Sequence, residues 1–349
     1  MLKKSPYSQK SPSLLEPVNN TLMIQFDWSE KIQNHVFKSW LDTGGSGVRI
    51  AVLDTGVDLA HPALKHLDKA GRKFNAALPG FNPAKPLLGG NDDVTDAHRK
   101  KGHGTQCVCV LTSKEEGENA LRGFLPEAEV FILKINTVDH KFFRVKDFLR
   151  GLEAAANLGV DIVVASVSYA LEDLALEGIS QAEIDRVFGL LAASGAVLFA
   201  SLPNRSDGDV WKGLPAANFP SLRPEVVNVG AFSKGIFEKR KAEIDAEANI
   251  HFLVSNASAN FCKIKNEYVQ EPISSSYGTY LVAGVAALYL ASIKKREKES
   301  YKPRPMGDFL KGLSQKFVSL REAQEWDGTL PVLFKTSAVK SGAVDTATT

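Results

Sequence analysis

Short apolar runs rich in β-branched residues recur along the chain, separated by longer stretches in which apolar and polar residues mix. Runs of this length and composition predict β-strands that are buried on both faces. They lie at residues 48–53, 129–135, 160–167, 196–202 and 225–232.

Amphipathic patterns fill several of the gaps between these runs. Residues 145–159 and 181–195 carry apolar side chains at three- and four-residue spacing, and each ends in glycine, so both predict helices. The alternation predicts an α/β class: a doubly wound, mostly parallel sheet with helices on both faces. Functional groups in such sheets collect beyond the carboxyl ends of the strands, which directs attention to the loops at Asp54, Ser166 and Leu202.

A further helix is predicted at 280–292, where the sequence is apolar almost all the way round, as for a helix buried on every side. The charged residues 293–299 follow it. We therefore divide the chain into an N-terminal extension (1–45, with a short helix around 28–40), a peptidase-like domain (46–292) and a C-terminal extension (293–349) whose last dozen residues are expected to be disordered.

Composition narrows the classes of partner. The 349 residues are 44% hydrophobic and 23% charged with a net charge of +2, which predicts neither nucleic acid nor membrane as a partner. No run reaches the roughly 18 uninterrupted apolar residues of a membrane span, and the N-terminus lacks a signal-peptide core. Cys107 and Cys109 lie two apart on an expected helix and point to different sides, so we predict free thiols and an intracellular protein. No spacing resembles a zinc site.

Three polar residues lie where the sheet predicts a site. Asp54 ends a buried strand and could orient a catalytic group, or close the strand as a turn residue. His103 lies between glycines at the start of an apolar helix, where it could act as a base or be an ordinary loop histidine. Asn204, beyond another strand, could donate to an oxyanion or form a turn.

The tripeptide Asp-Thr-Gly suggests a rival, because it is also the signature of aspartic proteases and occurs here at Asp42 and Asp54. A single-chain aspartic protease takes one such aspartate from each of two lobes. The two copies are too close in the sequence to belong to separate lobes, and the single-copy type is an all-β dimer. The α/β alternation disfavours this alternative.

Taken together, TGGSGVRIAVLDTGVD, then GHGT, then GFLPEAEVFILKI, then an Asn loop resemble the subtilisin-like serine proteases (subtilases, peptidase S8 family) from about Gly45 to about Ser292. The resemblance implies a subtilisin-like fold, with Asp54 and His103 as two members of a catalytic triad and Asn204 in the oxyanion hole. It also implies that substrate pairs with Ser166, Val167 and Ser168.

The nucleophile depends on how SSSYGTYLVAG (274–284) is aligned. Aligning on Gly278-Thr279 places Tyr280 at the serine and requires a four-residue deletion. Aligning on LVAG needs no gap and places Ser276 there. We favour Ser276, because the serine must lie where the buried helix begins, so that the helix N-terminus faces the oxyanion.

Several residues depart from the family pattern. Ser274 replaces a glycine, Tyr280 replaces a proline, residues 106–109 (QCVC) replace smaller side chains, and Ser168, where glycine is usual, is expected to narrow the first specificity pocket. We therefore expect a serine endopeptidase that acts on unstructured polypeptide through an acyl-enzyme. The alternative is a catalytically impaired pseudoprotease that binds peptides or proteins.

The remaining expectations concern location and accessory groups. We expect a cytoplasmic protein, with no nucleic acid or membrane partner, that could be a module of a larger multidomain protein. The resemblance permits calcium, but the sequence identifies no ligands, so no cofactor is predicted. Secreted subtilases usually carry a signal peptide and a folding pro-domain, and the about 45 residues before the first strand fit neither. We therefore expect either that the domain folds unaided in the cytoplasm or that the natural chain is longer.

Overall fold

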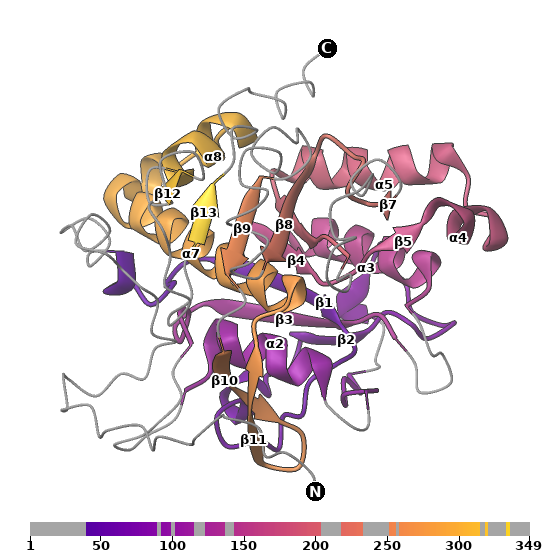
Figure 1. Cartoon of the computed structure of the whole chain (residues 1–349). Coiled ribbons are helices and arrows are strands. Elements are labelled where there is room, and N and C mark those ends of the chain that lie inside the picture. The colour runs from indigo at the N-terminus through magenta and orange to yellow at the C-terminus, as the bar shows by residue number, and fades with distance from the viewer. Residues whose placement is uncertain are drawn as a thin grey trace, which may run out of the picture.

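The computed structural model of the chain describes residues 40–88, 92–98, 102–114, 123–136, 143–203, 218–232, 251–255, 258–314, 318–319 and 333–335. Within this part, a nine-stranded sheet runs through the centre of the molecule (Figure 1). Its order is β12 (Val318–Ser319), β13 (Leu333–Lys335), β9 (Phe252–Ser255), β8 (Val226–Phe232), β6 (Val197–Ser201), β4 (Ile162–Ala165), β1 (Arg49–Asp54), β3 (Glu129–Lys134) and β2 (Lys73–Asn75).

The five apolar runs form β1, β3, β4, β6 and β8, which confirms the strands predicted from the sequence. From β9 to β2 all neighbours pair in parallel, and only β13 pairs antiparallel, with β9. From β1 the chain runs to β2 at the edge of the sheet, returns to β3 between β2 and β1, and then crosses to β4 on the other side of β1. The order therefore reverses between β1 and β4, where parallel sheets bind their ligands at the carboxyl edge.

Helices cover both faces of the sheet, as predicted for a doubly wound α/β fold. On one face, Ile50 and Val52 pack in a core with α2 (His103–Thr112), α7 (Ser275–Glu297) and α8 (Met306–Ser314). On the other, Ala51 and Leu53 pack with α3 (Val145–Leu158) and α5 (Gln181–Ser194). Successive residues of β1 thus serve two cores, because side chains of a strand alternate between its faces.

Helix α7 lies at the centre of the first core and begins earlier than predicted. Ser274 is its N-cap and accepts a hydrogen bond from the Tyr277 amide, so the helix starts at Ser275 rather than at 280. By length and composition alone α7 could cross a membrane, but 89% of its most apolar window is buried within the protein. It is the core helix that its all-round apolar sequence predicts.

Smaller elements complete the described part. β5 (Tyr169–Ala170) pairs with β7 (Asn218–Phe219), and β10 (Ser258–Lys263) forms an antiparallel hairpin with β11 (Glu267–Pro272). The remaining helices are α4 (Leu171–Leu176), η1 (Lys65–Leu67), η2 (Pro86–Leu88) and η4 (Lys298–Ser300). The helix predicted around 28–40 lies outside the described residues except for Trp40, which is helical, and so does the C-terminal tail; the domain limits stay a prediction.

Candidate active site

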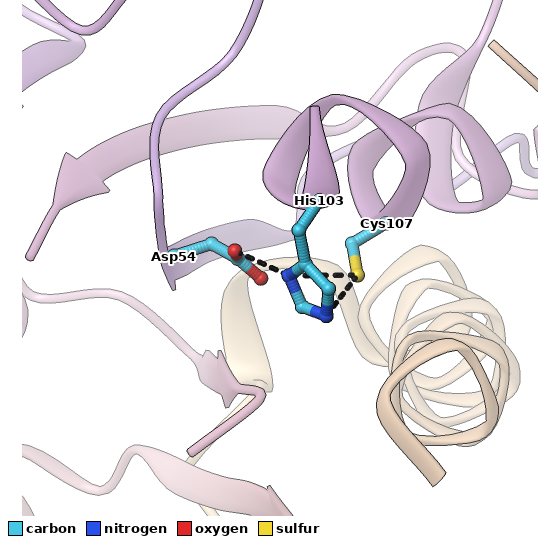
Figure 2. A group of neighbouring side chains, drawn as sticks. All are labelled: Asp54, His103 and Cys107. Carbon is cyan, nitrogen blue, oxygen red and sulfur yellow. Dashed lines mark hydrogen bonds and ion pairs between the residues drawn. The ribbon is translucent and has the colours of Figure 1, made fainter. Parts of the chain in front are cut away.

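A buried carboxylate and an imidazole meet at the carboxyl end of β1. Asp54 is the last residue of that strand and is 2% exposed, and His103 is the first residue of α2. His103 Nδ1 lies 2.7 Å from Asp54 Oδ1, with the ring suspended from the first turn of the helix (Figure 2). Gly102 permits this entry: it has φ +68°, and a Cβ there would lie 2.3 Å from the Ile264 side chain.

The two groups shift each other's proton affinity. Burial raises the pKa of Asp54, but the charge of His103 and the hydrogen bonds from His103, the Thr55 amide and the Tyr280 hydroxyl more than offset it, so the net pKa lies below the usual value. Burial lowers the pKa of His103, and the adjacent Asp54 carboxylate raises it above that of a free histidine. The pair is therefore suited to proton transfer: the His103 imidazole can accept a proton, and the Asp54 carboxylate stabilises the imidazolium that results.

A second buried aspartate holds the start of α2 in place. Asp96 Oδ1 accepts hydrogen bonds from the Thr55 hydroxyl (2.8 Å) and the His98 amide (2.9 Å). Its Oδ2 accepts from the amide and the hydroxyl of Thr105, at 2.9 and 2.7 Å. Since Thr55 follows Asp54 and Thr105 lies two residues after His103, Asp96 ties together the two segments that carry the pair.

Ser276 lies in the first turn of α7 and is 7% exposed. The Ser275 hydroxyl donates to the carbonyl of Leu202 (2.6 Å), which anchors this turn at the end of β6. The Tyr277 ring stacks on the His103 ring with centroids 6.1 Å apart. The start of α7 is thereby brought against the histidine, although among the described residues the His103 ring bonds only to Asp54 and Cys107 and not to the Ser276 hydroxyl.

Cys107 lies one turn after His103, and the donor atoms of Asp54, His103 and Cys107 all lie within 4.8 Å of one another (Figure 2). Two ligands of a tetrahedral zinc ion are separated by about 3.3 Å, whereas the carboxylate and imidazole are already hydrogen-bonded at 2.7 Å. The Cys107 sulfur is 3.9 and 4.0 Å from the two ring nitrogens, and burial raises the pKa of its thiol. These donors fit a hydrogen-bonded pair packed against a neutral thiol better than a metal centre.

The predicted substrate segment, Ser166, Val167 and Ser168, lies between β4 and β5 at the same edge of the sheet as Asp54. Among the described residues the buried hydroxyls of Ser166 and Ser168 have no hydrogen-bond partner. Asn204, predicted for the oxyanion hole, lies outside the described residues.

The prediction of three free thiols is wrong for two of the cysteines. Cys109 and Cys262 form a disulfide with Cα atoms 5.6 Å apart, and Cys107 is free. As predicted, Cys107 and Cys109 point to different sides of α2. The partner of Cys109 lies 153 residues away on β10, a pairing that sequence spacing does not indicate.

Sequence reasoning also missed Tyr280 as a site residue. Its side chain is fully buried, and its hydroxyl donates to Asp54 Oδ2 at 2.9 Å. The available signal was its presence, one turn after Ser276, where the subtilase-like pattern carries proline.

The model of the subtilase family (peptidase S8) matches residues 45–311. An intracellular serine protease of Paenibacillus polymyxa is 28% identical over 253 residues, which span 71% of this chain and 68% of that protein. The major intracellular serine protease of Bacillus subtilis is 24% identical over 262 residues, which span 74% and 71%.

Solved structures show the same fold at lower identity. The prenylagaramide maturation protease PagA superposes with a TM-score of 0.53 at 19% identity, covering 79% of this chain and 86% of that one. A cold-adapted subtilisin-like serine proteinase superposes with a TM-score of 0.52 at 17% identity, covering 83% and 89%. At these identities the likeness concerns the fold.

Proposed function

Because this chain belongs to the subtilase family of serine proteases, we propose that it is a serine endopeptidase that cleaves peptide bonds through an acyl-enzyme. The observation that carries the proposal is the 2.7 Å contact between Asp54 and His103 at the sheet edge, with the first turn of α7 packed against the imidazole.

In the proposed reaction, Ser276 attacks the scissile carbonyl and His103 takes its proton, which it later gives to the leaving amine. Asp54 holds Nδ1 protonated, so that Nε2 is free to accept, and it stabilises the imidazolium. The Ser276 amide, in a first helical turn whose N–H groups have no partner within the helix, donates to the oxyanion together with Asn204. Each of these groups belongs to the protein, so the proposed steps require no cofactor.

The proposed substrate is an unstructured polypeptide whose backbone lies along residues 166–168. The buried, unpartnered hydroxyls of Ser166 and Ser168 supply polar groups at that edge. Ser168 is expected to narrow the first specificity pocket and to favour a small side chain there. The intracellular proteases among the relatives support a cytoplasmic location. The inference from free thiols no longer supports it, because Cys109 and Cys262 form a disulfide, a bond that is rare in cytosolic proteins.

A second candidate is a pseudoprotease that binds peptides along the same segment, residues 166–168. The observation favouring it is that, within the described part of the chain, the bonds of the His103 ring go to Asp54 and Cys107 and not to Ser276. Catalytic contacts are often long in free enzymes and tighten when substrate binds, which is why the protease is the first candidate.

A fluorophosphonate probe distinguishes the two. The wild type should be labelled, Ser276→Ala should not, and its turnover of a peptide substrate should fall on the order of 10⁶-fold. Ser292→Ala is the matched control, because it removes a hydroxyl from the same helix that, within the described part of the chain, bonds only to the carbonyl of Tyr289. A folded wild type that binds peptide but takes no label would establish the pseudoprotease, and labelling retained in Ser276→Ala would remove the assigned nucleophile.

A further inference from the structure

The carboxylate of Asp54 is held from three directions. Oδ1 contacts His103 Nδ1 and accepts the Thr55 amide, each at 2.7 Å. Oδ2 accepts the hydroxyl of Tyr280 at 2.9 Å. The tyrosine comes from a different element, α7, 226 positions along the chain, and its side chain has no exposed surface. Both oxygens of the aspartate are therefore fixed, and the second is fixed by the helix that also carries Ser276.

Ser276 and Tyr280 lie one helical turn apart, so their side chains project from the same face of α7. Hydrogen bonds hold the start of α7 to its surroundings: the Ser275 hydroxyl donates to the carbonyl of Leu202, and the Tyr280 hydroxyl donates to Asp54. Of these two, the Tyr280 bond is the one that reaches the carboxylate of the site. It links the start of α7 directly to the end of β1, where Asp54 also contacts His103.

We propose that Tyr280 is a positioning residue of this site: its hydroxyl locks the Asp54 carboxylate and, through α7, sets where Ser276 lies against His103. The inference rests on the proposed protease function for its catalytic consequence. The contact with Asp54 itself does not depend on catalysis.

A tyrosine that only filled space would have no electrostatic influence on the histidine. A hydroxyl that donates to Asp54 Oδ2 withdraws negative charge from the carboxylate. Removing this donor leaves more charge facing Nδ1, so the imidazolium is favoured and the pKa of His103 rises. The orientation of the carboxylate is also released, which slows proton transfer. Because the change removes a hydrogen bond to a charged group, we expect kcat to fall about tenfold.

The test is Tyr280→Phe, which keeps the ring and removes the hydroxyl. Histidine NMR, with the His103 resonance assigned by its loss in His103→Ala, should show a higher His103 pKa than in the wild type. The acid limb of the kcat/KM profile should move to higher pH, and kcat should fall about tenfold while KM changes less than about twofold. Tyr289→Phe, two and a half turns further along α7 and remote from Asp54, is the matched control and should change none of these.

Two further variants separate a positioning role from a structural one. In an Asp54→Ala background, Tyr280→Phe should leave the His103 pKa unchanged, because the hydroxyl acts through the missing carboxylate. Replacing Tyr280 with 3-fluorotyrosine, whose hydroxyl is a stronger donor, should lower the His103 pKa, and this variant serves if the phenylalanine variant does not fold.

The outcomes are distinguishable from those of the protease proposal. A His103 pKa that is the same in folded Tyr280→Phe and in the wild type would overturn the positioning role, whatever the activity. An unlabelled wild type in which the His103 pKa still responds to Tyr280→Phe would refute the protease and leave Tyr280 as the residue that positions Asp54.

Discussion

The disulfide between Cys109 and Cys262 makes a quantitative prediction about stability. It joins α2, six residues after His103, to β10 and closes a loop across 153 positions of sequence. In the chain-entropy account, a cross-link of that span removes about 5 kcal/mol of conformational entropy from the unfolded state. The two cysteines are buried, at 2% and 0% exposure, and pack in the core with Phe261. Reduction should therefore act mainly on the unfolded chain and leave the native contacts in place.

The assay is urea unfolding of the oxidised protein with and without dithiothreitol. We expect reduction to lower the free energy of unfolding by several kcal/mol, with about 5 kcal/mol as the full entropic value. Cys107→Ala should keep this response, because Cys107 is free. The Cys109→Ala/Cys262→Ala double variant should be as stable with reductant as without it.

Thiol counting supplies an independent check on the same reasoning. The oxidised protein, unfolded without reductant, should show one reactive thiol, and after reduction three. Three thiols before reduction, or an unfolding free energy that does not change with dithiothreitol, would refute the cross-link and the loop-closure argument built on it.

Three further predictions follow from the site and its surroundings. Because Asp54 raises the pKa of His103, and the imidazole must be neutral to accept a proton, the acid limb of kcat/KM should fall above the free-histidine value of about 6.5. Burial lowers the pKa of His251 to about 4, so between about pH 6.5 and pH 4 the unfolded chain binds a proton at this histidine and the folded protein does not. The free energy of unfolding should therefore fall by about 3 kcal/mol as the pH is lowered through that range. In urea titrations, His251→Asn should remove this part of the pH dependence. A Cβ on Gly104 would lie 2.1 Å from the carbonyl oxygen of Gly56. Gly104→Ala should therefore lower the Tm and reduce the free energy of unfolding by about 1–3 kcal/mol, although alanine is the better helix former. An unchanged Tm would contradict the close approach.

The strands and helices that the sequence predicts correctly share one property: the apolar or amphipathic pattern that defines each of them lies entirely within one continuous segment. β1, β4 and α3 are continuous apolar or amphipathic runs, and local periodicity suffices to find them. The hairpin of β10 and β11 and the short strands β12 and β13 were not predicted. β13 has three residues and β12 has two, and they are strands because β9 offers an open edge, a property of the tertiary structure.

The site residues fall into the same two groups: those that a local sequence motif identifies and those that depend on contacts between distant segments. Asp54 and His103 follow motifs that the resemblance places at a strand end and a helix start, and the structure brings them together. Ser276 as the nucleophile and residues 166–168 as the substrate strand stay predictions. The contact of Tyr280 with Asp54 and the pairing of Cys109 with Cys262 join segments more than 150 positions apart, and no local pattern specifies which distant residue a side chain meets.

One departure from the family pattern, Gln106, contacts helix α7 across the α2–α7 interface. Gln106, the first of the four substituted positions 106–109, accepts a hydrogen bond from the Tyr277 hydroxyl at 2.9 Å, and both side chains are buried, at 1% and 5% exposure. Ser274 has φ −84°, which any residue adopts, so the loss of a glycine there costs no backbone strain. The substituted Gln106 is therefore coupled to Tyr277 by a buried hydrogen bond across the interface.

That coupling can be measured between Gln106 and Tyr277. Tyr277→Phe alone leaves the buried Gln106 carbonyl without its donor, which should cost about 1–3 kcal/mol. Once Gln106→Met has removed the acceptor, the same tyrosine change should cost about 1 kcal/mol less, because no buried acceptor is then stranded. Urea unfolding of the wild type, the two single variants and the double variant gives the coupling energy. Strictly additive losses would show that the Tyr277 hydroxyl does not stabilise Gln106, and the buried hydrogen bond would then not explain how the substituted residue is accommodated.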